Sequence, residues 1–130
     1  MTQTDHLPFL PSLTLVGYWS SGRGEDGLPD PREFVDEAWD EEERLDVVFY
    51  LERGLTVRAF MGYSQCRFCG IDNGNEEWSD GTYVWPQGLA HYVRAHGVRL
   101  PQPFVDHIAR IETLIEDLVI DEQWWRSQKP

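Results

Sequence analysis

The sequence is short of basic residues. Its 130 residues include one lysine, Lys129, and its 23 acidic residues outnumber its 11 basic residues to give a net charge of −12. Proteins that bind nucleic acid normally carry a basic surface, because each phosphate contact requires a cation. This composition therefore makes nucleic-acid binding unlikely, and the acidity serves either solubility or a surface that contacts a basic protein partner or imitates DNA.

Long apolar segments are also missing. No apolar run approaches the roughly twenty residues that a membrane-spanning helix needs, and the N-terminus lacks the basic and apolar regions of a secretory signal. We therefore expect no membrane segment and a cytoplasmic location. Six Trp, five Tyr and six Phe supply anchors for a core, so the composition predicts one folded domain over residues 1–130.

Cysteine occurs only twice, as Cys66 and Cys69, in the run Cys66-Arg67-Phe68-Cys69-Gly70. A Cys-x2-Cys pair followed by glycine is typical of a tight turn that points both sulfurs at one ion. Gly70 lets the chain leave that turn without a Cβ clash. Because zinc prefers four thiolate or imidazole ligands in a tetrahedron, two further ligands are expected elsewhere in the chain.

His91 and His96 are the candidates for the second pair, since four residues separate them, a spacing found in structural zinc sites. In a regular helix the two positions would lie about 140° apart. They converge only if the last turn loosens, and Gly97 is placed for a left-handed C-terminal residue that would allow this. Pro86 suits the first position of the same helix.

Other interpretations of these residues remain open. Cys66 and Cys69 could form a redox pair or be inert core cysteines, although no βαβ pattern surrounds them. His91 could be a core histidine, and His96 could interact with the C-terminal end of the helix dipole. Asp80 and His107 are substitute ligands if one histidine does not bind.

Between the two pairs lie twenty-one residues, more than the about twelve of short DNA-reading fingers. This interval contains residues 76–79 and 82–85 on either side of Asp80-Gly81, a signal for a type I′ hairpin turn. The order of knuckle, β-hairpin and helix predicts a treble-clef-like zinc finger within a small α+β domain that has helices on both sides of the finger.

The flanking segments divide by composition. We expect an extended arm and loop at 1–30, helical structure at 31–54, the zinc-finger unit at 55–100 and a C-terminal helix at 103–125. The first helix would run over 31–39 with Asp30 as its N-cap, and the second would begin at Asp40–Glu43. Residues 55–63 alternate like a strand.

Inward-facing residues follow from helical spacing. Phe34, Val35 and Trp39 would face the core from the first helix, and Leu45, Val48, Phe49 and Leu51 from the second. In the C-terminal helix the stripe is Phe104, Ile108, Ile111, Ile115 and Leu118, widened by Leu114 and Val119. Trp124 and Trp125 are expected to be packing anchors, although an exposed pair would form a partner-binding surface.

Three segments of the sequence carry a resemblance. The segments around Gly62–Gly70, Asp80–Val93 and Val98–Pro101 resemble a signature of small bacterial proteins to which no activity is assigned. The resemblance covers roughly residues 45–107 and implies a shared fold. The finger portion also resembles Cys2His2 zinc fingers, from which it departs by its longer linker and acidic balance.

These features lead to a main hypothesis and two alternatives. The main hypothesis is a cytoplasmic bacterial zinc-binding protein in which the ion is structural and the domain is a protein-interaction module. The first alternative is an enzyme in which His96 points away, water binds the open zinc position, and Glu76, Glu77 or Asp80 acts as general base. The second is weak nucleic-acid binding through Arg58, Arg67, Arg94 and Arg99.

A surface patch beside the zinc is a separate possibility. Tyr83, Trp85, Tyr92, Arg94 and Arg99 could form an aromatic and cationic surface that binds bases, sugars or peptides. The competing interpretation is that Trp85 and Tyr92 pack the finger against the final helix.

Overall fold

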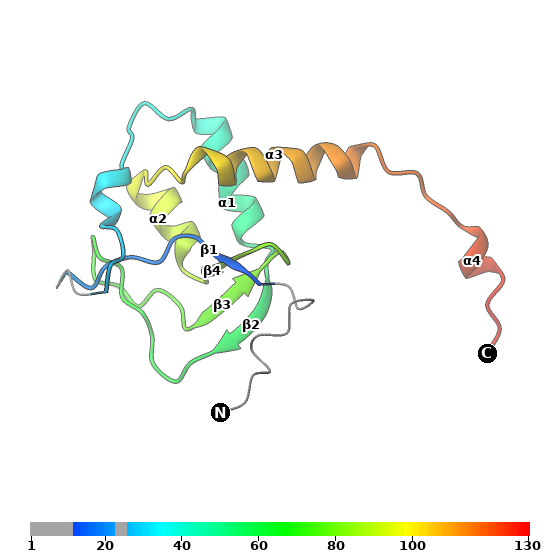
Figure 1. The fold of residues 1–130 in the computed structure, drawn as a ribbon, viewed down its shortest axis with the longest axis horizontal. Helices are drawn as coiled ribbons and strands as arrows, with labels where there is room; N and C mark the ends of the chain where they lie inside the picture. Colours follow the sequence, from blue (N-terminus) through cyan, green and yellow to red (C-terminus); the bar gives the residue numbers. More distant parts are fainter. Residues whose placement is uncertain (1–11, 23–25) are drawn as a thin grey trace.

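A mixed four-stranded sheet and the helices above it form one α+β domain in the computed structural model, which describes residues 12–22 and 26–130 (Figure 1). The strands are β1 (Thr14–Leu15), β2 (Leu55–Ala59), β3 (Glu76–Ser79) and β4 (Tyr83–Pro86), in the order β1-β4-β3-β2. β1 runs parallel to β4, and the other pairs are antiparallel. The predicted arm lies mostly outside the described residues, but its end supplies β1.

Two hairpins share β3. The first joins β2 to β3 and continues beyond the sheet, because Phe60 N–H donates to the Asn75 carbonyl and Asn73 N–H to the Ser64 carbonyl. Its tip is the Cys66–Cys69 turn. The second joins β3 to β4, as the sequence predicted, and brings the chain back toward that tip.

The type I′ turn predicted at Asp80-Gly81 is wrong. A type I′ turn requires positive φ at both central residues, but among the described residues only glycines have positive φ, and here it is Gly81 at 95°. Asp80 instead accepts the backbone N–H groups of Thr82 and Tyr83 at 2.9 and 2.8 Å. The side chain of Asp80 therefore closes the turn.

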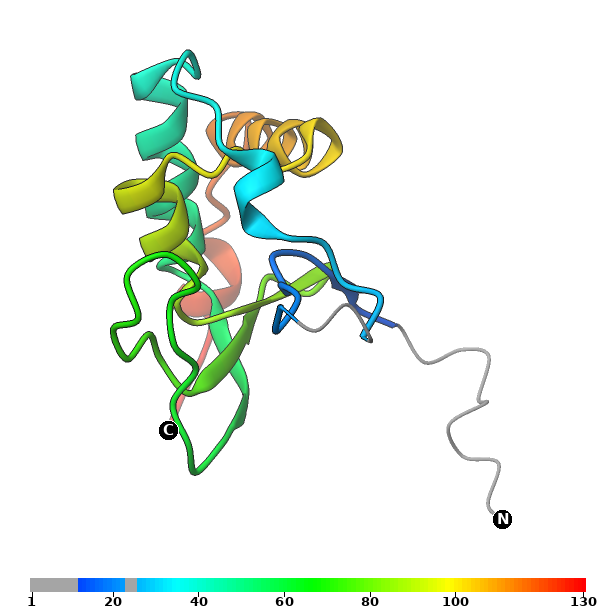
Figure 2. The same ribbon diagram turned by 90° about the vertical axis from the view of Figure 1, so that its left-hand side faces the viewer.

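Helices α1 (Glu41–Leu51) and α2 (Leu89–His96) run side by side (Figures 1 and 2). The core forms where α1, α2, β4 and the start of α3 (Gln102–Glu116) meet, and Trp85 is at its centre. The Trp85 indole N–H donates to the Leu51 carbonyl at 3.1 Å. This bond satisfies a buried polar group and ties the end of α1 to the sheet.

The length of one predicted helix and the start of another require correction. The Asp30 cap is confirmed, since its carboxylate accepts the Arg32 N–H, but the helix is a single 3-10 turn over Pro31–Phe34. Pro86 ends β4, and α2 begins at Leu89 after Gly88. The hairpin keeps Pro86 in the sheet because Glu77 pairs with it across β3 and β4.

The N-terminus of α1 matches the prediction, with Asp40 as its cap and Glu41, Glu42 and Glu43 in its first turn. Its predicted core face is only half right. Val48 and Leu51 are buried, as is Val47, but Leu45 and Phe49 are exposed. Val35 is likewise exposed and bridges Val98, whereas Trp39 is buried.

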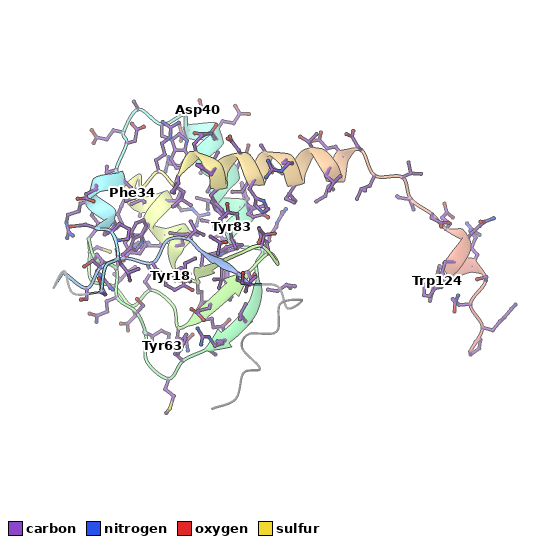
Figure 3. The ribbon with its side chains drawn as sticks, viewed as in Figure 1. Tyr18, Phe34, Asp40, Tyr63, Tyr83 and Trp124 are labelled. Atoms are coloured by element: carbon purple, nitrogen blue, oxygen red, sulfur yellow. The ribbon has the colours of Figure 1, made fainter. Side chains whose placement is uncertain are left out.

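The C-terminal helix departs most from expectation. It ends at Glu116, and a short α4 (Gln123–Arg126) follows. Phe104 and Ile108 are buried, but the outer half of α3 projects beyond the domain and α4 lies away from it (Figure 1). Trp124 and Trp125 are 68% and 73% exposed, so the prediction that they anchor the core is wrong (Figure 3).

Within residues 12–22 and 26–130, no helix has both the length and the apolar character that crossing a membrane requires.

Candidate metal centre

The Cys66–Cys69 turn has the backbone of a metal-binding knuckle. Gly70 N–H donates to the Cys66 carbonyl at 2.9 Å, and Cys66 N–H donates to the Ile71 carbonyl at 3.0 Å. The N–H of Phe68 donates to Cys66 Sγ at 3.4 Å, which directs a positive dipole at the sulfur. Gly70 adopts φ of 75°, a conformation that glycine accepts without strain. These bonds give the turn the backbone arrangement that a pair of metal-binding thiolates needs.

Helix α2 brings two imidazoles to this knuckle. His91 lies in its first turn and His96 is its last residue. Gly97 follows in the left-handed conformation, with φ of 64° and ψ of 24°, and its N–H bonds to the Tyr92 carbonyl. The two rings lie 5.0 Å apart between centroids. The predicted convergence of the histidines at a loosened helix end is thus what the chain adopts.

One potential ligand atom from each of Cys66, Cys69, His91 and His96 lies within 4.8 Å of the other three. Zinc–sulfur bonds of about 2.3 Å and zinc–nitrogen bonds of about 2.0 Å in a tetrahedron place sulfur and nitrogen about 3.6 Å apart. Cys69 Sγ lies 3.4 Å from His91 Nε2. The four side chains can therefore hold a metal ion with little rearrangement.

The imidazole of His96 supplies a further test of fit. Its Nε2 is buried and has no hydrogen-bond partner, although buried polar groups are rarely left unsatisfied. Phe68 stacks on the ring at 4.6 Å and an interplanar angle of 13°, which fixes its orientation. A metal bound at Nε2 would satisfy this atom.

The electrostatics at His91 favour metal binding. Burial and the neighbouring His96 lower the pKa of His91. Both effects favour the neutral imidazole, which is the form that binds metals. Cys66 is buried, whereas Cys69 is exposed, so the site lies at the surface with one thiol inside.

Contacts beyond the four ligands hold the knuckle in place. The Tyr92 hydroxyl accepts the Arg67 N–H at 2.9 Å, and the Arg67 guanidinium donates to the carbonyls of Ser20 and Gln65 at 3.0 and 2.7 Å. Arg32 donates to the Arg67 carbonyl at 2.6 Å. Sequence reasoning missed these roles, because the bonds join segments far apart in the chain.

The start of α2 is pressed against the segment that leaves the knuckle. A Cβ added to Gly88 would lie 2.2 Å from the Asn73 carbonyl oxygen. Asn73 in turn donates from Nδ2 to the Gly88 carbonyl at 3.1 Å. This close approach sets the position of His91, three residues further along the chain.

The predicted surface patch does not form. Trp85 and Tyr92 are buried in the core, in agreement with the competing interpretation. Tyr83 packs edge-on against Phe104 at 4.8 Å. The two remaining members pair with carboxylates, Arg94 with Glu52 at 3.2 Å and Arg99 with Asp36 at 2.8 Å.

The proposed substitute ligands do not belong to the cluster. His107 Nε2 lies 2.8 Å from Asp80 Oδ2, and the Tyr50 hydroxyl donates to the same oxygen at 2.6 Å. Asp80 and His107 therefore satisfy each other in a separate buried network.

The alternative of an open zinc site required His96 to point away and an acid to serve as base. His96 instead joins the cluster. The proposed acids are engaged elsewhere: Glu76 accepts from Thr56 and Trp78, at 2.9 and 2.8 Å. Within the described residues, the geometry favours a closed four-ligand shell.

A cleft of about 500 Å³ lies beside the knuckle. Glu77 lines it, and its carboxylate accepts from the Tyr18 hydroxyl and from Arg58 Nε, both at 2.6 Å. Burial and the contact with Glu77 raise the pKa of Tyr18. Burial opposes ionisation of Glu77, but the bonds from Arg58 and Tyr18 outweigh it and lower its pKa. Sequence analysis named Glu77 as a candidate general base and Arg58 as a candidate nucleic-acid contact, but gave no signal that the two pair with each other or that Tyr18 joins them.

Comparison of the chain with protein-family models, with curated proteins and with solved structures finds no match in any of the three.

Proposed function

We propose that the chain binds one zinc ion through Cys66, Cys69, His91 and His96, and that the ion is structural. The observation that carries this proposal is the mutual approach of the four ligand atoms to within 4.8 Å. Two thiolates and two imidazoles are the donor set that zinc prefers. The order of knuckle, hairpin β3–β4 and helix α2 supports a treble-clef-like finger.

A structural role follows from the number of ligands. Catalytic zinc keeps one position open for water or substrate, whereas four protein ligands close the shell. The ion would join the tip of the β2–β3 hairpin to both ends of α2. Thiolate ligands also require a reducing compartment, which is why we propose a cytoplasmic location.

We further propose that the zinc-stabilised domain is a protein-interaction module for a basic partner. The supporting observation is an acidic hollow of about 260 Å³ between α1 and α3, which is lined by Asp40, Glu42, Glu43, Asp46 and Glu112. Among the described residues no basic side chain lines it. A cationic segment bound there would relieve the repulsion between these carboxylates.

Cobalt substitution tests the metal site. Co²⁺ in a tetrahedral Cys2His2 site gives intense visible d–d bands and thiolate charge-transfer bands, which zinc then displaces. We expect one equivalent of Co²⁺ to produce both. Weak bands typical of octahedral cobalt would contradict the closed tetrahedral shell.

Titration with a cationic amphipathic peptide of alternating lysine and leucine blocks tests the acidic hollow. We expect binding that Asp46→Asn with Glu112→Gln weakens. The matched control is Asp117→Asn with Asp121→Asn, which removes the same charge outside the hollow. Equal weakening by both pairs would show attraction to net charge alone and would contradict a built surface.

A further inference from the structure

The outer half of α3 and the tail beyond it carry a large unpaired apolar surface. Seven apolar side chains between residues 114 and 125 are more than half exposed: Leu114, Ile115, Leu118, Val119, Ile120, Trp124 and Trp125. Isolated exposed apolar residues are ordinary, but a contiguous group of this size marks an interaction site. The two tryptophans stand out because each can bury about 150–250 Å².

The domain also has an unfilled apolar hollow of its own. It measures about 260 Å³ and lies between α1 and α3. Phe49, Tyr50, Ile111 and Ile115 line it, together with the charged residues Arg53, Asp80 and Glu112. Phe49 is 55% exposed although it projects from a core helix. We call this site the apolar hollow; it adjoins the acidic hollow, since Glu112 lines both.

The tail carries adjacent tryptophans and few charges of its own. Residues 123–130 include two basic side chains, Arg126 and Lys129, of which Arg126 pairs with Glu122 at 2.6 Å. Burial and the neighbouring carboxylates of Asp46 and Glu116 raise the pKa of Glu112 at the edge of the hollow. Two adjacent exposed tryptophans with Lys129 close behind them therefore match a mainly apolar hollow that has Glu112 at its edge.

The direction of α3 determines whether the tail can reach the apolar hollow of its own chain. The helix carries the chain outward from the domain, and α4 ends far from the α1–α3 crossing (Figure 1). Figure 3 shows Trp124 pointing into open space. The tail is thus presented to a neighbouring molecule.

We propose that two copies of this chain exchange C-terminal tails, with Trp124 and Trp125 of each copy filling the apolar hollow of the other. The exchange is reciprocal, so it gives a closed two-fold dimer rather than a filament. Two tryptophans per tail bury about 300–500 Å². With a similar area from each hollow, two exchanges bury about 1,200–2,000 Å², which is the size of a standard stable interface.

The first test is the mass of the full-length protein, by light scattering and sedimentation over a wide range of concentration. We expect twice the chain mass of 15.2 kDa. Replacing both tail tryptophans, Trp124→Ala with Trp125→Ala, should raise the dissociation constant about a hundredfold, since buried tryptophans dominate interface energies. Met61→Ala, which removes a fully exposed side chain on the β2–β3 hairpin, is the matched control and should leave the dimer intact.

Mixing two monomeric variants distinguishes tail exchange from other dimers. Phe49→Glu on α1 alters only the hollow, and the double tryptophan variant alters only the tail. Each alone should be monomeric, but their mixture should regain a weak dimer, because the tail of the Phe49→Glu chain fits the intact hollow of the other. Circular dichroism and zinc content should match wild type in all variants, which separates this test from that of the metal site.

Three results would overturn the proposal. A monomeric wild-type protein would mean that the tail folds back on its own hollow or binds another protein. A dimer that survives loss of both tryptophans would mean that other surfaces pair. A mixture that stays monomeric would mean that the tails pack on each other.

Discussion

Asp80 is the most heavily bonded side chain outside the metal cluster. Its Oδ2 accepts from Tyr50 at 2.6 Å and from His107 at 2.8 Å, while its Oδ1 closes the β3–β4 turn. Burial raises the pKa of Asp80, but the bonds from Tyr50 and from the backbone N–H groups lower it by more. The carboxylate is therefore ionised in the folded protein to a lower pH than in the unfolded chain.

This environment predicts how Asp80→Asn behaves with pH. A depressed folded pKa contributes stability above the unfolded pKa of about 4, and the contribution is lost as the pH falls below it. We expect Asp80→Asn to cost about 1–3 kcal/mol at neutral pH, because an amide has one acceptor oxygen and cannot accept all four hydrogen bonds that the two carboxylate oxygens accept. The difference from wild type should shrink as the pH falls below about 4.

Urea denaturation at several pH values measures this effect. The control is Asp106→Asn, an exposed carboxylate on α3 that accepts only from Gln102. A gap between wild type and Asp80→Asn that stays constant down to low pH would show that lost packing, and not lost charge, is responsible.

At the same scale, the four residues of the candidate metal cluster were predictable, and the contacts that support them were not. The Cys66–Cys69 spacing and the Gly70 turn are local features that a sequence displays directly. Arg67 reaches Ser20, and Tyr92 reaches the Arg67 backbone; these contacts depend on tertiary packing that no local pattern encodes. Asp80 and His107 were named as substitute ligands for the same reason, because no local pattern shows that the two side chains contact each other.

Among the elements, the junction between α2 and the segment after the knuckle positions the metal site. Gly88 lies against Asn73 so closely that a methyl group would overlap its carbonyl oxygen. The φ of Gly88 is −82°, so alanine would suffer no backbone strain there. Any effect of a Cβ at this position must come from pushing α2 away from the knuckle.

We therefore expect Gly88→Ala to weaken zinc binding. Displacement of a ligand by a fraction of an ångström impairs metal sites, and changes around the ligands typically cost about 10–100-fold in affinity. Competition with a chromophoric chelator measures the affinity. Gly62→Ala is the matched control, because a Cβ there meets no heavy atom within 4 Å, and its affinity should equal that of wild type. Equal affinities for all three proteins would contradict the proposed role of the junction.

The bounds of helices and strands were predicted well where local periodicity and capping residues determine them. They were predicted poorly where tertiary packing determines them. The acidic start of α1 and the β3–β4 hairpin are confirmed by the structure. The start of α2 was misplaced because pairing within the sheet retains Pro86. The stripe of α3 predicts a helix correctly, but periodicity does not show what covers it, so the burial of Ile115 and Leu118 was wrongly expected.

For the whole molecule, the metal proposal couples binding to folding. A ligand that binds only the folded chain stabilises it by about 4 kcal/mol at a thousand times its dissociation constant. We expect a chelator to lower the midpoint temperature of thermal unfolding by roughly ten degrees or more. Added zinc should restore it. Differential scanning calorimetry in the presence and absence of chelator gives the comparison, and an unchanged midpoint would show that the ion, if bound, does not support the fold.

The acidity of the chain acts at this scale as well. The carboxylates of α1 and α3 repel one another at the acidic hollow, while the tail beyond residue 122 is basic and aromatic. Composition predicted an acidic surface, and the structure adds its location and the apolar hollow beside it. The tail exchange and the basic partner use adjoining sites, so measuring one in the presence of the other shows whether they compete.

The most direct test of the account is the zinc content of the purified protein, measured by elemental mass spectrometry for the wild type beside His96→Ala. We expect one zinc per chain in the wild type, and loss of zinc or of the fold in the variant, because His96 supplies one of four ligands in a closed shell. A wild-type protein that is folded with both thiols free and contains no metal would contradict the central claim. A folded His96→Ala variant that retains zinc as tightly as wild type would contradict the closed shell.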